Sequence, residues 1–224
     1  MVALNVEVEQ ARQAILKTMH KLVVTFVASV WCICCANAKK YYNDAEWILT
    51  FEDQFEGDKL NETNWNVRTN QSHCCQLGKE ELELYVPGEV FLSNSKLNIR
   101  TRYVEAPVIG PSGKTFKYTS GWIDTKMKVS QKWGKFEANC SLPSRLSRGA
   151  WPAFWLMPNA NICWPTGGEI DIFEFNADPL QDSIFGSYHW AEKNECGKDK
   201  APIPGRGYRP VNSSNDWQEE YHVY

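Results

Sequence analysis

The chain has 224 residues, 43% of them hydrophobic, which is enough for one domain with a sizeable core. Its formal net charge is only −3, with both signs scattered along the chain, and this argues against a nucleic-acid-binding protein, because such proteins usually carry a basic patch. Aromatic residues make up 13% and include ten Trp, whose indole rings can fill a core or offer a flat face to a sugar ring.

The N-terminal region is predicted to be a leader. The apolar run Leu22–Cys35 has 14 residues, fewer than an ordinary membrane span needs. It ends in Ala36-Asn37-Ala38, a pattern typical of signal-peptide cleavage. We therefore expect residues 1–38 to be an extension plus signal peptide, cleaved after Ala38, and the protein to be secreted without stable membrane insertion. The alternative is an uncleaved signal anchor.

Secretion has consequences for the cysteines and for glycosylation. Five cysteines follow the leader: Cys74, Cys75, Cys140, Cys163 and Cys196. In an oxidising compartment some of them should pair, and Cys163 with Cys196 is the first candidate, because the two flank the acidic strand described below and the loop after it. Four Asn-x-Ser/Thr sequons are candidate glycan sites: Asn61, Asn70, Asn139 and Asn212.

From residue 46 onward, short apolar or alternating runs recur, broken by Gly, Pro, Asn and Ser, and no long helical pattern appears. Such runs predict an all-β sandwich or barrel. The predicted strands are Trp47–Phe51, Glu81–Val86, Val90–Leu92, Lys96–Thr101, Gly121–Val129, Lys135–Leu142, Ala153–Met157, Glu169–Phe175 and Ser183–Trp190. Two stretches rich in Pro and Gly, Glu105–Lys114 and Asn194–Pro210, are predicted to be surface loops.

Three acidic residues lie close together in the predicted strand Glu169–Phe175. Alternate residues of a strand share a face, so Glu169 and Asp171 point the same way, whereas Glu174 would point the other way. One extra residue, a β-bulge between Asp171 and Glu174, would bring all three to one face. The apolar residues between the acids indicate a central strand that is buried on its other face.

The three acids suggest acid–base chemistry. Like charges on one strand face repel, so at least one carboxyl should keep its proton near neutral pH. A glycosidase obtains a general acid beside an ionised nucleophile in this way. The alternative is a solvated acidic strand edge, but a structural sheet gains nothing from such a stack, and we favour catalysis.

The run Gly168-Glu169-Ile170-Asp171-Ile172-Phe173-Glu174 resembles the signature of glycoside hydrolase family 16. Further stretches resemble segments of the same family, in the same order: Tyr118–Gly121, Trp133–Ala138, Ala150–Pro158, Trp164–Gly168 and Ser187–Trp190. The resemblance runs from about Phe51 to the last residue. It implies a β-jelly-roll sandwich, concanavalin A-like, with a sugar-binding cleft on its concave sheet.

The resemblance also implies a role for each acid. Glu169 resembles the nucleophile, Glu174 the acid/base, and Asp171 the acid between them that tunes their protonation. The spacing with its bulge resembles the laminarinase and agarase branch, so we expect hydrolysis of internal β-1,3- or mixed β-1,3-1,4-glucan linkages by a retaining mechanism. This chemistry needs no metal or cofactor, although the family often carries a structural calcium.

Four further residues are expected to contact the substrate. Trp155 and Trp164 resemble sugar platforms, and His189 resembles a hydrogen-bonding partner near the acids. Trp151 is the fourth candidate, and it could equally belong to the core. The expected partner is a β-glucan polysaccharide, bound by a monomer.

The end of the chain resembles the start of a strand that continues, in the family, into several more. We therefore expect residues 39–224 to form a catalytic domain that is incomplete at its C-terminus. Two other functions use the same fold: β-glucan recognition without turnover, and transglycosylation. Binding-only relatives typically lose the acid pair, so the presence of Glu169 and Glu174 favours an enzyme.

Overall fold

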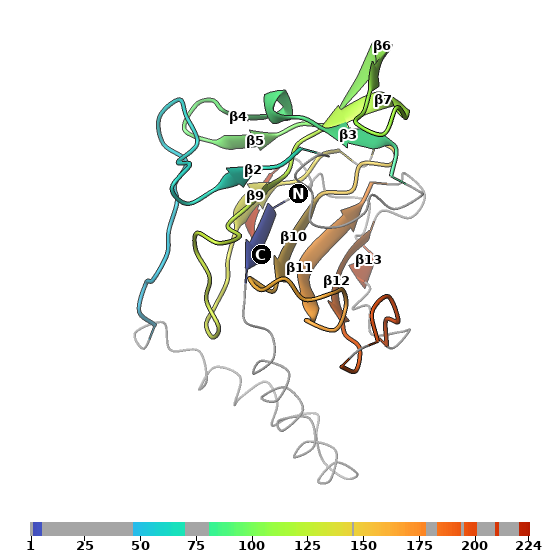
Figure 1. The fold of residues 1–224 in the computed structure, drawn as a ribbon. Helices are drawn as coiled ribbons and strands as arrows, with labels where there is room; N and C mark the ends of the chain where they lie inside the picture. Colours follow the sequence, from blue (N-terminus) through green and yellow to red (C-terminus); the bar gives the residue numbers. More distant parts are fainter. Residues whose placement is uncertain are drawn as a thin grey trace.

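The fold is known from a computed structural model (Figure 1). The structure describes residues 2–5, 47–69, 81–144, 146–177, 183–193, 195–200, 209–210 and 220–224. Within these ranges the regular secondary structure consists of strands, apart from a single 3₁₀ turn at Pro87–Glu89. The all-β prediction is therefore confirmed. Within the described part of the chain, no helix has the length and hydrophobicity needed to span a bilayer.

The largest sheet has seven strands in the order β13-β12-β11-β10-β1-β8-β2. Its members are β1 (Val2–Asn5), β2 (Asn66–Val67), β8 (Ile123–Asp124), β10 (Ala153–Met157), β11 (Glu169–Asn176), β12 (Ser183–His189) and β13 (Arg209–Pro210). Strands β10, β11 and β12 pair antiparallel and carry the acidic run. They lie side by side in Figure 1.

Strand β1 was not expected from the sequence. It lies between β10 and β8 and runs parallel to both. Ala3 pairs with Trp155 on one side and Asp124 on the other. These residues belong to the predicted N-terminal extension, whereas the predicted signal peptide and its cleavage site lie outside the described residues.

Three smaller sheets complete the architecture. Their strands are β3 (Glu83–Tyr85), β7 (Thr115–Ser120) and β6 (Arg102–Ile109) in the first, β4 (Val90–Leu92) and β5 (Leu97–Ile99) in the second, and β9 (Asn139–Ser141) and β14 (Tyr221–Val223) in the third. The first two lie together at the top of Figure 1, above the β10–β12 region.

An apolar layer covers the face of β10 and β11 that is opposite to the acids. Phe154 of β10 pairs with Phe173 of β11, and both are buried together with Phe175 and Leu142. Tyr224, which follows β14, packs against this cluster, with ring centroids 4.5 Å from Phe173. The β9–β14 pair therefore forms the second layer of a sandwich over the main sheet.

Three sequence predictions about strands are wrong. The predicted loop Asn194–Pro210 ends in strand β13, which pairs with β12. Trp47–Phe51 forms no strand, because its residues 47–50 are all solvent-exposed and have no sheet to pair with. The predicted loop Glu105–Lys114 is a strand as far as Ile109, within β6. Pro107 is tolerated there because β6 is an edge strand, where a missing N–H breaks no ladder on the open side.

Candidate active site

The predicted β-bulge is present on β11. The pairing of β11 with β12 shifts in register between Asp171 and Glu174. Asp171 pairs with Ser187, and Glu174 pairs with Phe185, two residues away on a regularly alternating strand. Since Ser187 and Phe185 share a face, Asp171 and Glu174 share it too. The three acids thus lie on one face of the sheet.

Each glutamate receives an indole N–H. Trp164 Nε1–H donates to Oε2 of Glu169, and Trp151 Nε1–H donates to Oε1 of Glu174 at 2.8 Å. Ser187 Oγ lies 3.5 Å from the other oxygen of Glu174. Both indole donors stabilise a carboxylate and orient it, because hydrogen bonds to an ionised acceptor are the stronger kind.

The carboxyl of Glu169 holds its proton more tightly than an ordinary glutamate. Burial, followed by the negative charge of Asp171, raises its pKa to about 8. His189 and the Trp164 N–H act in the opposite direction, because both stabilise the ionised form. At least one carboxyl of this group therefore keeps its proton near neutral pH, as the sequence predicted, and it belongs to Glu169, the residue whose expected role is the nucleophile.

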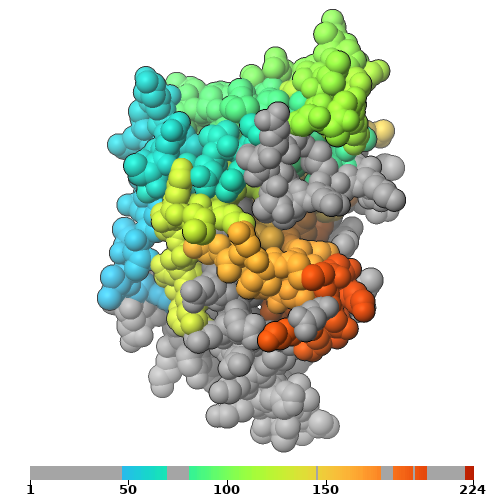
Figure 2. All heavy atoms as spheres, viewed as in Figure 1, coloured from blue at the N-terminus to red at the C-terminus, as the bar shows by residue number. Residues whose placement is uncertain are grey.

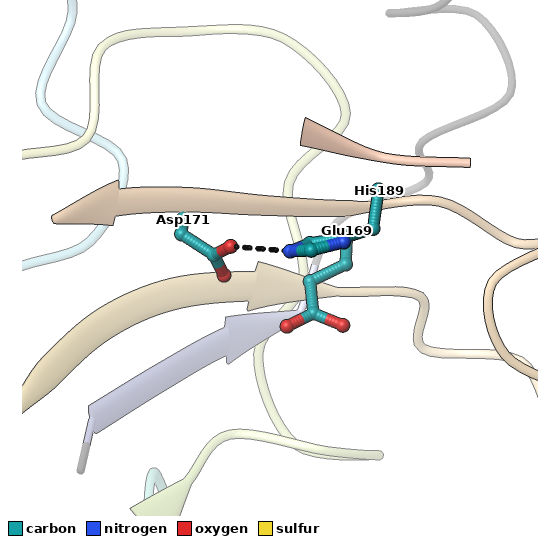
Figure 3. A group of neighbouring side chains, drawn as sticks. All are labelled: Glu169, Asp171 and His189. Atoms are coloured by element: carbon teal, nitrogen blue, oxygen red, sulfur yellow. Dashed lines mark ion pairs between the residues drawn. The ribbon is translucent and has the colours of Figure 1, made fainter. Parts of the chain in front are cut away.

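His189 lies between two carboxylates. Its Nε2 is 3.2 Å from Oδ2 of Asp171, and its Nδ1 is 2.6 Å from Oδ2 of Asp199. Hydrogen bonding to Asp171, together with Asp199 and Glu169, raises the pKa of His189 to about 9 despite its partial burial. Figure 3 shows Glu169 and Asp171 on β11 with His189 opposite them on β12, and the ion pair from His189 to Asp171.

The four predicted substrate-binding residues divide into two groups. Trp151 and Trp164 are 44% and 39% exposed and touch the glutamates, and His189 touches Asp171. Trp155 lies on the same face, because it pairs with Asp171, but it is only 6% exposed. Its ring packs against Trp122 at 5.5 Å, so it has no free face for a sugar, and the platform role expected for Trp155 does not fit.

The same cluster could in principle hold a cation. One ligand atom each from Glu169, Asp171 and His189 lie within 4.8 Å of one another. However, the imidazole Nε2 faces Asp171 as an ion-pair partner, and a protonated ring has no lone pair for a metal. We therefore assign the group to acid–base chemistry.

The predicted disulfide joins Cys163 to Cys196, with Cα atoms 5.6 Å apart. It connects the segment before β11 to the loop after β12, and these segments adjoin on the face seen in Figure 2, in orange and orange-red. Cys140 is a free, half-buried thiol. Cys74 and Cys75, and the sequons at Asn70 and Asn212, lie outside the described residues.

Sequence reasoning missed two residues of the site. Ser187 precedes His189 by two positions on β12, so strand alternation alone could have placed it on the acid face. Asp199 lies in a loop ten residues after His189, and nothing in the sequence signals their contact.

Several proteins of similar sequence and structure are named as glucanases. The chain is 30% identical over 189 residues to glucan endo-1,3-beta-glucosidase A1 of Niallia circulans, covering 79% of this chain and 26% of that protein. The endo-beta-1,3-glucanase of Pyrococcus furiosus superposes with a TM-score of 0.63 at 30% identity, covering 80% of this chain and 66% of that one. The laminarinase catalytic domain of Thermotoga maritima gives 0.65 at 28%, covering 80% and 68%.

The strand architecture and the acid face together define a β-jelly-roll protein of the glycoside hydrolase class. The family model described as "XgeA-like, catalytic GH16 domain" matches residues 140–201, which include all three acids. The chain belongs to glycoside hydrolase family 16 and is similar to its laminarinase-like members. The family and the jelly-roll fold predicted from the sequence are thereby confirmed. The chain spans between 26% and 58% of the length of three curated relatives that it matches.

Proposed function

We propose that the protein hydrolyses internal linkages of β-1,3-glucans, or of mixed β-1,3-1,4-glucans, by a retaining double displacement. The observation that carries the proposal is the bulge, which puts Glu169, Asp171 and Glu174 on one face. The relatives that match the chain are named as endo-1,3-β-glucanases and 1,3-1,4-β-glycanases, which supports glucans as the substrate class.

In the first step Glu174 donates its proton to the glycosidic oxygen while a carboxylate oxygen of Glu169 attacks the anomeric carbon. The leaving chain departs as an alcohol and a glycosyl-enzyme ester remains. In the second step Glu174, now ionised, takes a proton from water, whose oxygen attacks the anomeric carbon and releases Glu169. Two inversions at one carbon retain its configuration. The reaction requires neither a metal nor a cofactor.

Individual contacts of the two glutamates support these roles. The Trp164 N–H and the positive charge on His189 both oppose the burial that raises the pKa of Glu169, and so they favour its ionised form, which is the form that attacks. Trp151 is 44% exposed beside Glu174, so it can meet a sugar ring where the leaving group must be protonated. We propose Trp151 and Trp164 as the sugar-contacting rings and Asp171 as the acid that sets the charge of Glu169 and His189.

The decisive assay measures reducing ends released from laminarin, lichenan, agarose and xyloglucan by the full chain. Glu169→Gln and Glu174→Gln should each lower kcat by at least about a hundredfold, as expected when a nucleophile or a general acid is lost. Glu56→Gln changes an exposed glutamate far from the acid run in sequence and should match the unmodified protein. Binding of laminarin without any release of reducing ends would refute hydrolysis, and activity on agarose alone would refute the glucan assignment.

Azide identifies which glutamate is which. With an aryl glucoside substrate, Glu169→Gly plus azide should yield an α-glycosyl azide, because azide replaces the nucleophile directly. Glu174→Ala plus azide should yield a β-glycosyl azide, because azide then attacks the glycosyl-enzyme. The opposite pair of products would exchange the two roles.

The disulfide between Cys163 and Cys196 supports secretion, because such bonds persist in oxidising compartments. We propose that the protein is exported by its leader, is cleaved after Ala38, and acts as an extracellular monomer. N-terminal sequencing of the exported protein tests the cleavage. A sequence beginning at Lys39 supports it, and one beginning at Met1 or anywhere else before Lys39 contradicts it.

A further inference from the structure

A short loop after β12, residues 195–200, contacts two residues that adjoin Glu169 and Asp171. Cys196 is bonded to Cys163, and the next residue, Gly197, donates its N–H to the carbonyl of Trp164 at 2.8 Å. Trp164 in turn donates to Glu169. The loop therefore holds in place a ring that contacts the proposed nucleophile.

Asp199 connects the same loop to His189. Its Oδ2 lies 2.6 Å from Nδ1 of His189, while its Oδ1 accepts the backbone N–H of Trp190 at 3.3 Å. The N–H of Lys200 donates to the carbonyl of Trp190 at 2.8 Å. These contacts on both sides of the carboxylate fix its position relative to β12, so Asp199 is held where it meets the imidazole.

A carboxylate at each ring nitrogen determines the state of the imidazole. A neutral imidazole donates from one nitrogen only, and the other nitrogen would then face a carboxylate lone pair to lone pair. The hydrogen bond to Asp199 and the ion pair with Asp171 are both favourable only when the ring carries two N–H groups and a positive charge. The side chains are largely shielded from water, with 3% of Asp171, 21% of His189 and 27% of Asp199 exposed, so solvent screens the interaction only partly.

We infer that Asp199 is a positioning residue for catalysis, which keeps His189 as an oriented imidazolium against Asp171 beside the nucleophile Glu169. The inference rests on the proposed function. Asp199 itself is separated from the acids by the imidazole ring, so it acts through His189 and not on the substrate. The disulfide-anchored loop thus supports the acid cluster twice, through Trp164 and through Asp199.

The test compares Asp199→Asn with Asp199→Glu and with Glu192→Gln in the full chain. Asn keeps the size of the side chain but removes its charge, and we expect kcat on laminarin to fall about tenfold, the value of one charge-assisted hydrogen bond, with KM changed less than about twofold. Asp199→Glu restores the charge and should recover part of kcat. Glu192→Gln removes a negative charge from an exposed position near the same loop and should leave kcat within about twofold.

A second measurement is independent of turnover. The imidazole titration of His189, followed by NMR, should move to lower pH in Asp199→Asn and stay in place in Glu192→Gln. An unchanged titration and kcat in Asp199→Asn would overturn the inference, as would an equal loss in all three variants. If the unmodified protein cleaves no glucan, the proposed function fails, whereas the titration still decides whether Asp199 holds the imidazolium.

Discussion

Removing one indole nitrogen tests how far the Trp164 N–H lowers the raised pKa of Glu169. In Trp164→Phe an aromatic face remains for a sugar ring, but the N–H that donates to the carboxylate is lost. A hydrogen bond to a charged group is worth about 1.5–3 kcal/mol. Because Trp164 is 39% exposed, we take the lower end, about 1.5 kcal/mol. At 1.36 kcal/mol per pKa unit, the pKa of Glu169 should rise by about 1.

The assay is the pH profile of kcat/KM on laminarin. Attack requires ionised Glu169, so the acid limb should move up by about 1 pH unit and activity below the limb should fall about tenfold. Trp133→Phe is the matched control, since Trp133 is 50% exposed and its ring is not among the contacts of the acids. An acid limb that stays in place in Trp164→Phe would refute the reasoning that this N–H stabilises the nucleophile.

Three other predictions follow from the structure. The pKa of His189 is raised from 6.5 to about 9, so the stability that this residue contributes is fully present below pH 6.5 and is lost as the pH rises through about 9. The melting temperature should therefore fall between these pH values. In His189→Gln the fall should be smaller. Trp155→Ala should lower the free energy of unfolding in urea by about 3–5 kcal/mol, because Trp155 is buried, whereas Trp151→Ala should mainly raise KM, because Trp151 is exposed. The reverse pattern would contradict the placement of Trp155 in the core and of Trp151 on the surface. Ala3 pairs with strands on both sides of β1, and Ala3→Pro would break this pairing. If the leader is removed as proposed, the exported Ala3→Pro protein should have an unchanged melting temperature. A lower melting temperature would show that β1 is retained in the exported protein.

Local rules were enough to predict the acid face. The period of two along a strand places Glu169 and Asp171 together and Glu174 opposite. One extra residue brings all three together, so the bulge follows from the residue spacing once the acids are taken to share one site. The Cys163–Cys196 pairing could likewise be proposed from the two positions on either side of the acidic strand and the following loop. These features depend on neighbours in the chain or on elements joined directly in sequence.

The tertiary structure decided what those local rules could not reach. Trp155 lies four residues after Trp151. Trp155 belongs to the core because it packs in one cluster with Tyr85 and Trp122, which come from other parts of the chain, whereas Trp151 stays 44% exposed. Asp199 reaches His189 because a cross-linked loop folds back along β12. The sequence by itself was enough to name the candidate residues for acid–base chemistry. Contacts between segments distant in sequence decided which of these residues are buried and what holds them in place, because strand periodicity does not specify such contacts.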